Sequence, residues 1–260
     1  MESRVSMELR VLGCSGGIGA GHRTTSFLVD GESLIDAGSG VGSLTLDEMA
    51  HVRRIFLTHS HLDHVHCIPL MVDSIFDLVR QPIEVYAQAD TLRALEKHLF
   101  NGVIWPDFTR LPHPERPVLK FIPMDAEHPV RVGALKFRMI PVNHIVPTVG
   151  YCVSGPTGTF AFSGDTTTND SFWQALNAEP RLDLLVVEAA FADDEMELCR
   201  MARHYCPTLL AQDLRKLHHR PKVYLTHAKP GEEETIAHEC RQLISDRDVG
   251  QLSGGEVFTL

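Results

Sequence analysis

The sequence lacks the features that would tie it to a membrane or to an oxidising compartment. None of its apolar stretches approaches the ~20 residues that a membrane-spanning helix needs. Residues 1–10 do not contain the apolar core of a secretory signal. The six cysteines are scattered, without a C-x-x-C pair or a dense framework. We therefore expect free thiols, a cytoplasmic location and no membrane partner.

Positive charge is also scarce. The chain has 24 Lys and Arg against 34 Asp and Glu, which gives a formal net charge of −10. A surface that binds nucleic acid through its phosphates needs a basic footprint, so this balance argues against a nucleic-acid partner. A small anionic substrate stays open, because metal ions can supply positive charge locally.

The chain has the size and composition of one large globular domain. It has 260 residues, of which 43% are hydrophobic and 22% charged, and no linker rich in Gly, Ser or Pro divides it. We expect a single α/β domain over residues 1–260. Short apolar runs predict strands at 7–12, 24–29, 33–36 and 54–57, with later ones at 135–140, 159–162, 182–187 and 223–225. Helical spacing is found at 68–79, 91–99, 194–204, 207–217 and 232–243, so strands followed by helices occur twice over.

The most informative segment is residues 58–64, T-H-S-H-L-D-H, which directly follows the apolar run 54–57. Imidazole nitrogens and carboxylate oxygens are ligands that zinc prefers. The backbone between such close neighbours is too short to wrap all four donors around one tetrahedral ion. Residues two apart on an extended chain point the same way, so His59 and His61 can bind one metal while Asp63 and His64 serve a second. A merely histidine-rich loop is the alternative, and four donors in six residues argue against it.

Three further donors follow predicted strands elsewhere in the chain: His144, Asp165 and His227. The end of a strand can hold a ligand to the tolerance that metal geometry requires. A carboxylate has two oxygens, which makes Asp165 the natural bridge between two metals. A single histidine after a strand is usually structural, so the interpretation rests on the joint order of these residues with the first cluster.

This ordered set resembles the metallo-β-lactamase superfamily. The residues that carry the resemblance are H-S-H-L-D-H, His144, F-S-G-D-T around Asp165, L-T-H-A-K-P-G around His227, the opening L-G-C-S-G-G and the L-I-D-A-G turn. The resemblance implies an αββα sandwich with a two-metal site at one edge. It implies that His59, His61 and His144 hold one zinc, that Asp63, His64 and His227 hold the other, and that Asp165 lies between them. Asp36 would orient the histidine loop through hydrogen bonds.

The resemblance also implies hydrolytic chemistry. The oxygen-reducing di-iron branch has a carboxylate where this chain has His61, so we expect two zinc ions, with manganese or iron as alternatives. Two zinc ions lower the pKa of a water between them and neutralise charge on a phosphoryl oxygen. Asp63 and Asp165 are accordingly our catalytic candidates among the ligands.

Further motifs favour phosphodiesters. R-T-T-S at 23–26 is similar to the R-x-x-S stretch of ribonuclease Z and of class II cyclic-nucleotide phosphodiesterases. The H-x-H-L-D-H run, with I-P-L-M after it, looks like the motif of the class II phosphodiesterases. The chain differs from that family at Cys67, where the family has Gly or Ser. E-A-A-F at 188–191 occupies the place of ribonuclease Z's H-E-A-T-F, with Val187 replacing the histidine. His204, in a segment similar to an H-L-x-P helix start, is our candidate for a phosphate contact or leaving-group acid; a structural role near a helix end is the alternative.

Four residues are candidates for substrate contact. Arg23 and Lys229 could bind phosphate, although each could simply be solvated. Trp105 and Phe108 lie in the irregular segment 101–117 and could stack on a purine. The alternative for this aromatic pair is a place in the core, which we favour for Trp105.

The sequence thus predicts a dinuclear zinc phosphodiesterase that hydrolyses 3′,5′-cyclic AMP or GMP to the 5′-monophosphate through a hydroxide between the metals. The first alternative is a ribonuclease Z-like enzyme acting on tRNA 3′ ends, against which stand the net charge of −10 and the missing histidine at Val187. Hydrolysis of a lactone or thioester is another. A non-catalytic metal-binding or oxygen-sensing protein would need a damaged or carboxylate-rich second site. Homodimers are frequent among such relatives, and the sequence leaves this open.

Overall fold

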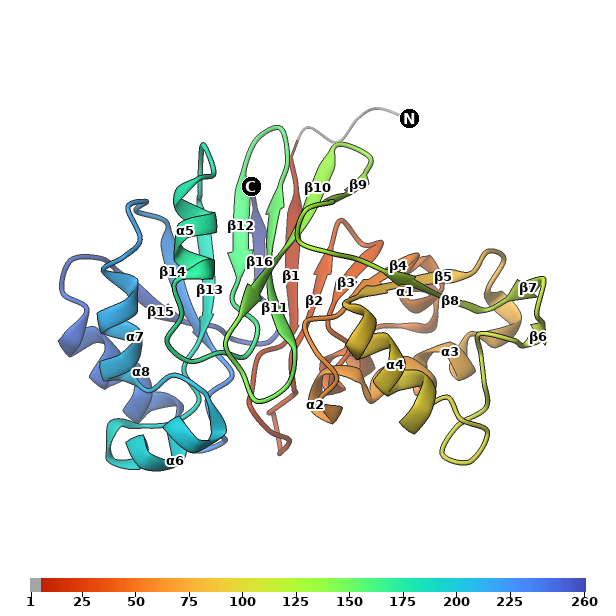
Figure 1. Ribbon diagram of the computed structural model, residues 1–260, viewed down its shortest axis with the longest axis horizontal. Coiled ribbons are helices and arrows are strands. Elements are labelled where there is room, and N and C mark those ends of the chain that lie inside the picture. Colours follow the sequence, from red (N-terminus) through yellow and green to blue (C-terminus); the bar gives the residue numbers. More distant parts are fainter. Residues whose placement is uncertain (1–5) are drawn as a thin grey trace.

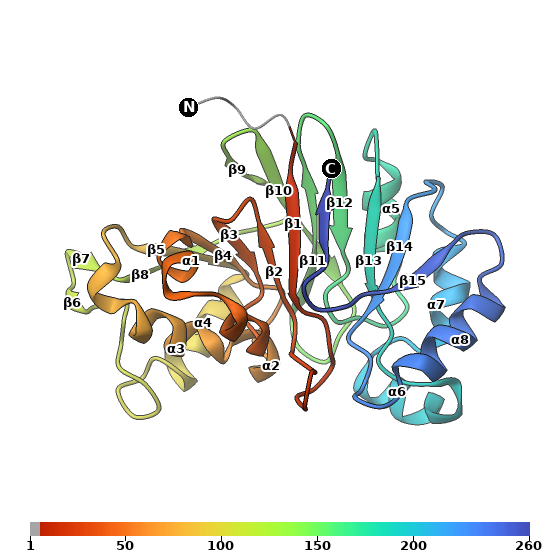
Figure 2. The ribbon, with the colours of Figure 1, turned by 180° about the vertical axis from the view of Figure 1, so that it is seen from behind.

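The structure, a computed structural model, describes residues 6–260 and arranges them in four layers (Figure 1). Two seven-stranded sheets pack face to face, and helices cover the outer face of each sheet, as the view from behind also shows (Figure 2). This arrangement confirms the predicted αββα sandwich. Within the described residues, no helix is long and apolar enough to cross a membrane.

The first sheet is built mostly from the N-terminal half, with the last strand of the chain at one edge. Its strands, in spatial order, are β16 (Val257–Thr259), β1 (Glu8–Gly13), β2 (Ser26–Val29), β3 (Ser33–Ile35), β4 (Arg54–Phe56), β5 (Ile83–Ala87) and β8 (Leu119–Pro123). The outer helices of this half are α1 (Leu46–His51), α2 (Leu62–Val65), α3 (Cys67–Ser74) and α4 (Ala89–His98), with 3-10 turns η1 (Ser39–Ser43) and η2 (Phe76–Leu78). A small hairpin, β6 (Pro112–His113) and β7 (Arg116–Pro117), lies apart from the sheet.

The second sheet is built from the C-terminal half. Its strands, in spatial order, are β15 (Val249–Gln251), β14 (Lys222–Thr226), β13 (Leu184–Glu188), β12 (Thr159–Phe162), β11 (Thr148–Ser154), β10 (Leu135–Val142) and β9 (Val130–Val132). Its outer helices are α5 (Ser171–Asn177), α6 (Met196–Ala202), α7 (Pro207–Leu214) and α8 (Glu233–Leu243), with η3 (Asp193–Glu195) before α6.

The burial pattern of the strands explains the layers. In β10, buried Leu135, Phe137 and Met139 alternate with half-buried residues, as expected of a strand with one face in the core. All five residues of β13 are buried because this strand lies in the middle of the sheet, parallel to both neighbours. Between the sheets the rings of Phe56 and Phe137 stack with centroids 4.1 Å apart, which joins the two halves.

The strand directions bring the candidate ligands to one edge of the sandwich. In the first sheet β3 and β4 run parallel. In the second, β12, β13 and β14 run parallel, and β10 points the same way because it is antiparallel to β11, which is antiparallel to β12. The carboxyl ends of these strands meet at the lower edge in Figure 1, the location at which sites form in such sheets.

Several predicted elements differ in extent. The helix expected over 194–204 ends at Ala202, because Arg203 adopts a left-handed conformation that ends the helix. The helix expected over 68–79 divides into α3 and the 3-10 turn η2. Helix α5 and strand β16 were not predicted, since a seven-residue helix and a three-residue strand are too short to show a clear period.

The two aromatic residues of the irregular segment belong to the core of the N-terminal half. Phe108 is 3% exposed, and its ring packs against those of Phe76 and Phe100. Trp105 is half-buried and packs against the same cluster. The prediction that Phe108 stacks on a substrate base is therefore wrong, since packing of its ring leaves no face for a ligand. The core position favoured for Trp105 agrees with its packing.

Candidate metal centre

The histidine loop begins where β4 ends, and a buried carboxylate holds it in place. Oδ1 of Asp36 accepts a hydrogen bond from the backbone N–H of Thr58 at 2.8 Å. Its Oδ2 accepts from the Thr58 hydroxyl at 2.8 Å and from Nδ1 of His64 at 2.7 Å. Asp36 therefore fixes the start of the loop and one of its imidazoles.

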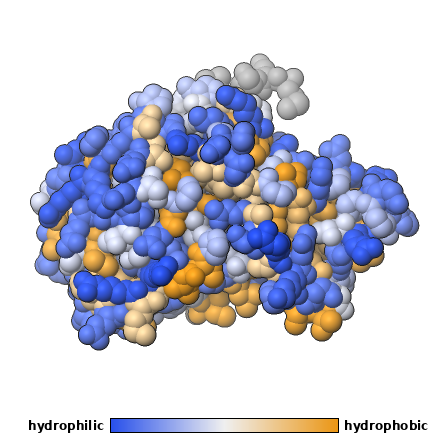
Figure 3. All heavy atoms as spheres, viewed as in Figure 1, coloured by the Kyte–Doolittle hydropathy of each residue, from blue (hydrophilic) through white to orange (hydrophobic). Residues whose placement is uncertain are grey.

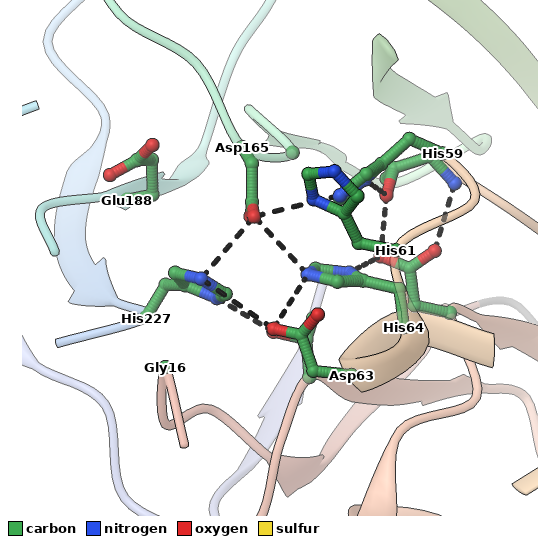
Figure 4. A network of polar contacts seen from close by, with 12 residues as sticks. Gly16, His59, His61, Asp63, His64, Asp165, Glu188 and His227 are labelled. Atoms are coloured by element: carbon green, nitrogen blue, oxygen red, sulfur yellow. Dashed lines mark hydrogen bonds and ion pairs between the residues drawn. The ribbon is translucent and has the colours of Figure 1, made fainter. Parts of the chain in front are cut away.

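Seven side chains converge beside this loop, in two groups that share one carboxylate: His59, His61, His144 and Asp165 in the first, and Asp63, His64, Asp165 and His227 in the second. Figure 4 labels all of them except His144. Within each group the potential ligand atoms all lie within 4.8 Å of one another. Oδ2 of Asp165 lies 3.3 Å from Nε2 of both His64 and His227, and 3.7 Å from Nε2 of His59. The shared carboxylate is thus central to both groups.

Hydrogen bonds decide which ring nitrogen of each histidine is free to bind a metal. The Thr58 hydroxyl donates to Asp36, so it accepts at 3.0 Å from Nδ1 of His59. His64 donates from Nδ1 to Asp36. In both rings Nδ1 is thus engaged and Nε2 faces the cluster, and both Nε2 atoms are buried without a hydrogen-bond partner among the described residues, as is Oδ1 of Asp165. Buried polar atoms without partners are rare, and here they face one another.

The electrostatics of the cluster fit a cation. Burial lowers the pKa of His144 to about 4 and that of His227 to about 3, so both imidazoles are neutral at pH 7, the state that binds metals. Burial has the same tendency at His64, but the flanking carboxylates of Asp165 and Asp36 outweigh it and raise its pKa well above the usual value. The donor types, the atoms without partners and this attraction for positive charge all suit a divalent metal.

The glycine-rich segment after β1 supports the last ligand. The backbone N–H of His227 donates to the carbonyl of Cys14 at 2.7 Å. A Cβ on Gly16 would lie 2.3 Å from the carbonyl oxygen of His227, so only glycine permits this approach. Three of the four non-glycine residues with positive φ among residues 6–260 are in this region: Asp36, Arg203 and His227. Strained backbone of this kind clusters at functional sites.

A second buried pair adjoins the metal ligands. Nδ1 of His204 donates to Oε1 of Glu188 at 2.7 Å, and the same oxygen accepts from the backbone N–H of Thr166 at 2.8 Å. The His204 ring lies 4.9 Å from that of His144 and 5.4 Å from that of His227, measured between centroids. Although burial opposes it, Glu188 raises the pKa of His204 above its usual value. The structure thus brings His204 to the ligand cluster.

The two basic residues that the sequence proposed as phosphate contacts, Arg23 and Lys229, lie in different places relative to the donor cluster. Arg23 is exposed and lines a hollow with Arg10, Leu12 and Gly254, a lining that includes none of the seven donors. Nζ of Lys229 donates to the carbonyl of Gly16 at 3.0 Å and lies 5.8 Å from the centroid of the Phe191 ring. Arg23 is therefore not brought to the cluster, whereas Lys229 lies beside it with its ammonium group already engaged.

Two polar residues in the site escaped sequence reasoning. In the sequence Glu188 stands out only as part of E-A-A-F, although a carboxylate at the end of a fully buried strand indicates a polar partner. The position of Arg203 in the site could not be predicted from the sequence. Its contact with the ligand loop depends on a left-handed turn at a residue other than glycine.

The surface around the cluster is apolar in part. Figure 3 shows apolar side chains gathered along the lower margin of the molecule, the margin at which the strand ends converge in Figure 1. Leu62 and Ile145, which directly follow His61 and His144 in the chain, are 67% and 53% exposed.

The four-layer sandwich and its cluster of His and Asp donors define a metal-binding protein of the αββα class. The sequence profile described as "Beta-lactamase superfamily domain" matches residues 33–228, and the chain belongs to this family. A protein from Yersinia pestis named "Probable 3′,5′-cyclic-nucleotide phosphodiesterase" is 26% identical over 260 positions, covering 83% of this chain and 73% of that protein. A "Ribonuclease Z" from Pseudomonas putida is 28% identical over 193 positions, covering 70% of this chain and 51% of that protein.

Among solved structures, that of unliganded yeast PDE1 superposes with a TM-score of 0.84 at 17% sequence identity, covering 98% of this chain and 99% of that one. At this identity the likeness concerns the fold alone. It shows that the two sheets and their helices are arranged similarly over the whole length of both chains.

Proposed function

We propose that this protein is a metal-dependent phosphodiesterase that holds two zinc ions and hydrolyses 3′,5′-cyclic AMP or GMP to the 5′-monophosphate. The observation that carries the proposal is the pair of donor groups that share Asp165 beside the Glu188–His204 pair. The similarity to the Yersinia pestis protein supports the substrate class. The six cysteines, all free, favour a cytoplasmic location.

His59, His61 and His144 would hold one metal, Asp63, His64 and His227 the other, and Asp165 would lie between them. Zinc bound there would supply hydroxide at neutral pH and neutralise negative charge on a phosphoryl group. Asp36 and Thr58 hold Nδ1 of His64 and His59, so that Nε2 of each ring is aimed at the site. Their contribution is to hold the donors before any substrate arrives.

His204 would protonate the leaving oxygen. Glu188 holds Nδ1 of its ring, so Nε2 is the nitrogen that can give a proton to O3′ when the bond between phosphorus and O3′ breaks. Hydroxide supplied by the metals would become the new oxygen on phosphorus, the bond between phosphorus and O3′ would break, and the proton from His204 would complete the new 3′-hydroxyl. The negative charge of Glu188 stabilises the protonated imidazole before this transfer.

The surroundings of the site favour a small nucleotide over a polyanion. Leu62 and Ile145 offer exposed apolar contact next to the ligands, which suits a nucleobase or another uncharged group attached to the phosphodiester. A long RNA would instead require a basic surface, and the net charge of the chain is −10.

Cleavage of tRNA 3′ ends is the second candidate, because the chain is also similar to the Pseudomonas putida ribonuclease Z. One experiment separates the two. The purified zinc-loaded protein is given cyclic AMP, cyclic GMP, bis(p-nitrophenyl) phosphate, a precursor tRNA and a lactone, and the specific rates are compared. We expect turnover of the cyclic nucleotides; cleavage of the precursor tRNA without it would overturn the proposal.

A further inference from the structure

Arg203 has an unusual backbone conformation at the end of α6. Its φ of 55° and ψ of 53° lie in the left-handed region, which a residue with a side chain adopts only at a cost in free energy. Glycine is the ordinary residue at such a helix end. Because the helix ends at this turn, the next residue, His204, lies outside it, and its ring is placed beside His144 and His227.

Two hydrogen bonds tie Arg203 to the loop that carries His144. Nη1 of the guanidinium donates to the backbone carbonyl of His144 at 2.9 Å. In return, Nδ1 of His144 donates to the backbone carbonyl of Arg203 at 2.9 Å. This reciprocal pair fixes the His144 ring with its Nε2 inside the donor cluster, 3.3 Å from Nδ1 of His61, and it holds a guanidinium at the rim of the site.

The guanidinium retains most of its donors. Arginine has five N–H groups, and the contact with His144 engages one of its nitrogens. Within residues 6–260, no carboxylate forms an ion pair with Arg203, and its side chain is exposed. By contrast, the Lys229 ammonium is engaged by Gly16, and Arg23 lines a hollow outside the donor cluster.

We propose that Arg203 is the residue that contacts the phosphoryl oxygens of the substrate, and that its remaining N–H groups stabilise the charge that grows on them during hydrolysis. The planar guanidinium matches phosphate oxygens in geometry, and a charge-assisted bond of this kind is stronger than a neutral one. The inference rests on the proposed phosphodiesterase function. It replaces Arg23 and Lys229 as the phosphate contact.

Arg203→Gly is the decisive variant, because it removes the guanidinium while suiting the left-handed backbone. Arg200→Ala is the matched control: it removes the same charge from an exposed position of α6. For each purified zinc-loaded protein, the melting temperature, the metal content, kcat/KM for bis(p-nitrophenyl) phosphate and the affinity for 5′-AMP by calorimetry are measured. Activity of the Arg203→Gly protein is measured again with millimolar guanidinium chloride, and Arg203→Lys tests a conservative replacement.

We expect Arg203→Gly to melt no lower than the wild type and to keep its metal. Its kcat/KM should fall by ~10²-fold, as is typical when one donor to a developing oxyanion is lost. Added guanidinium should restore part of the rate, Arg203→Lys should lie between the two, and binding of 5′-AMP should weaken at least tenfold. Arg200→Ala should stay within threefold of the wild type in every measurement.

Several results would overturn the inference. A change below threefold in Arg203→Gly would do so, as would loss of metal together with activity, which would mean that Arg203 only positions His144. If the wild type hydrolyses no phosphodiester, the proposed function itself fails. The inference then depends on 5′-AMP binding alone, and equal affinity of the wild type and Arg203→Gly would refute it.

Discussion

Oε1 of Glu188 and Nδ1 of His204 are joined by a 2.7 Å hydrogen bond between the end of one strand and the turn after one helix. The sequence shows Val187 where ribonuclease Z has a histidine, which suggests that a proton donor is missing. In the structure an imidazole reaches this place from another part of the chain, because the left-handed turn at Arg203 brings His204 to Glu188 at the strand end.

His204→Ala is expected to lower kcat by ~10²–10⁴-fold, the usual contribution of a general acid. Metal content, measured by elemental analysis, should not change, because the proposed ligand sets do not include His204. A decrease below threefold would assign His204 a purely structural role.

Glu188→Gln tests whether the pair acts as a unit. The amide keeps the shape of the carboxylate but loses the charge that raises the pKa of His204. We expect a ~10-fold or larger loss in kcat, and little further loss when Glu188→Gln is added to His204→Ala, because residues that act together are not additive. Fully additive losses in the double variant would argue against coupling.

Asp165→Ala is expected to release one or both metals, because its carboxylate is shared by the two donor groups. Metal per protein is measured by elemental analysis after dialysis against buffer without metal. The matched control is Asp125→Ala, an exposed carboxylate that, within residues 6–260, pairs with His128 and the backbone of its own loop. An unchanged ratio of metal to protein in Asp165→Ala would refute the bridging role.

The candidate metal ligands at the edge of the sandwich could be predicted from the sequence. The contacts between side chains from different elements at that edge could not. Ligands that follow strands, such as His59 and Asp165, are visible because an apolar run and a polar residue stand side by side in the chain. The pairing of Glu188 with His204 depends on where α6 ends. Helix α6 ends because Arg203 adopts the left-handed backbone conformation, which residue propensities do not predict for an arginine. Arg203 escaped prediction for the same reason.

The irregular segment shows a different limit. Its aromatic residues suggest contact with a substrate base, but Phe108 packs in the core cluster of the first half. A single aromatic residue without a periodic context carries no information on which way its ring points. Phe108→Ala should therefore reduce the free energy of unfolding by about 3–5 kcal/mol, while KM for a small phosphodiester stays within threefold. A large rise in KM with unchanged stability would restore the interpretation that Phe108 stacks on the substrate.

Asp36→Asn tests how strongly the histidine loop depends on its buried carboxylate. Asparagine tolerates the φ of 57° at this position, so the backbone should persist. The amide nitrogen cannot accept a hydrogen bond, so either Thr58 or His64 loses its acceptor and the orientation of one imidazole is released. We expect zinc affinity, measured by competition with a chromogenic chelator, to fall by ~10–100-fold.

Asp30→Asn is the matched control, because Asp30 shares the left-handed conformation at φ 49° in the turn between β2 and β3, away from the ligands. Equal zinc affinity in the two variants would mean that the loop holds its geometry without Asp36.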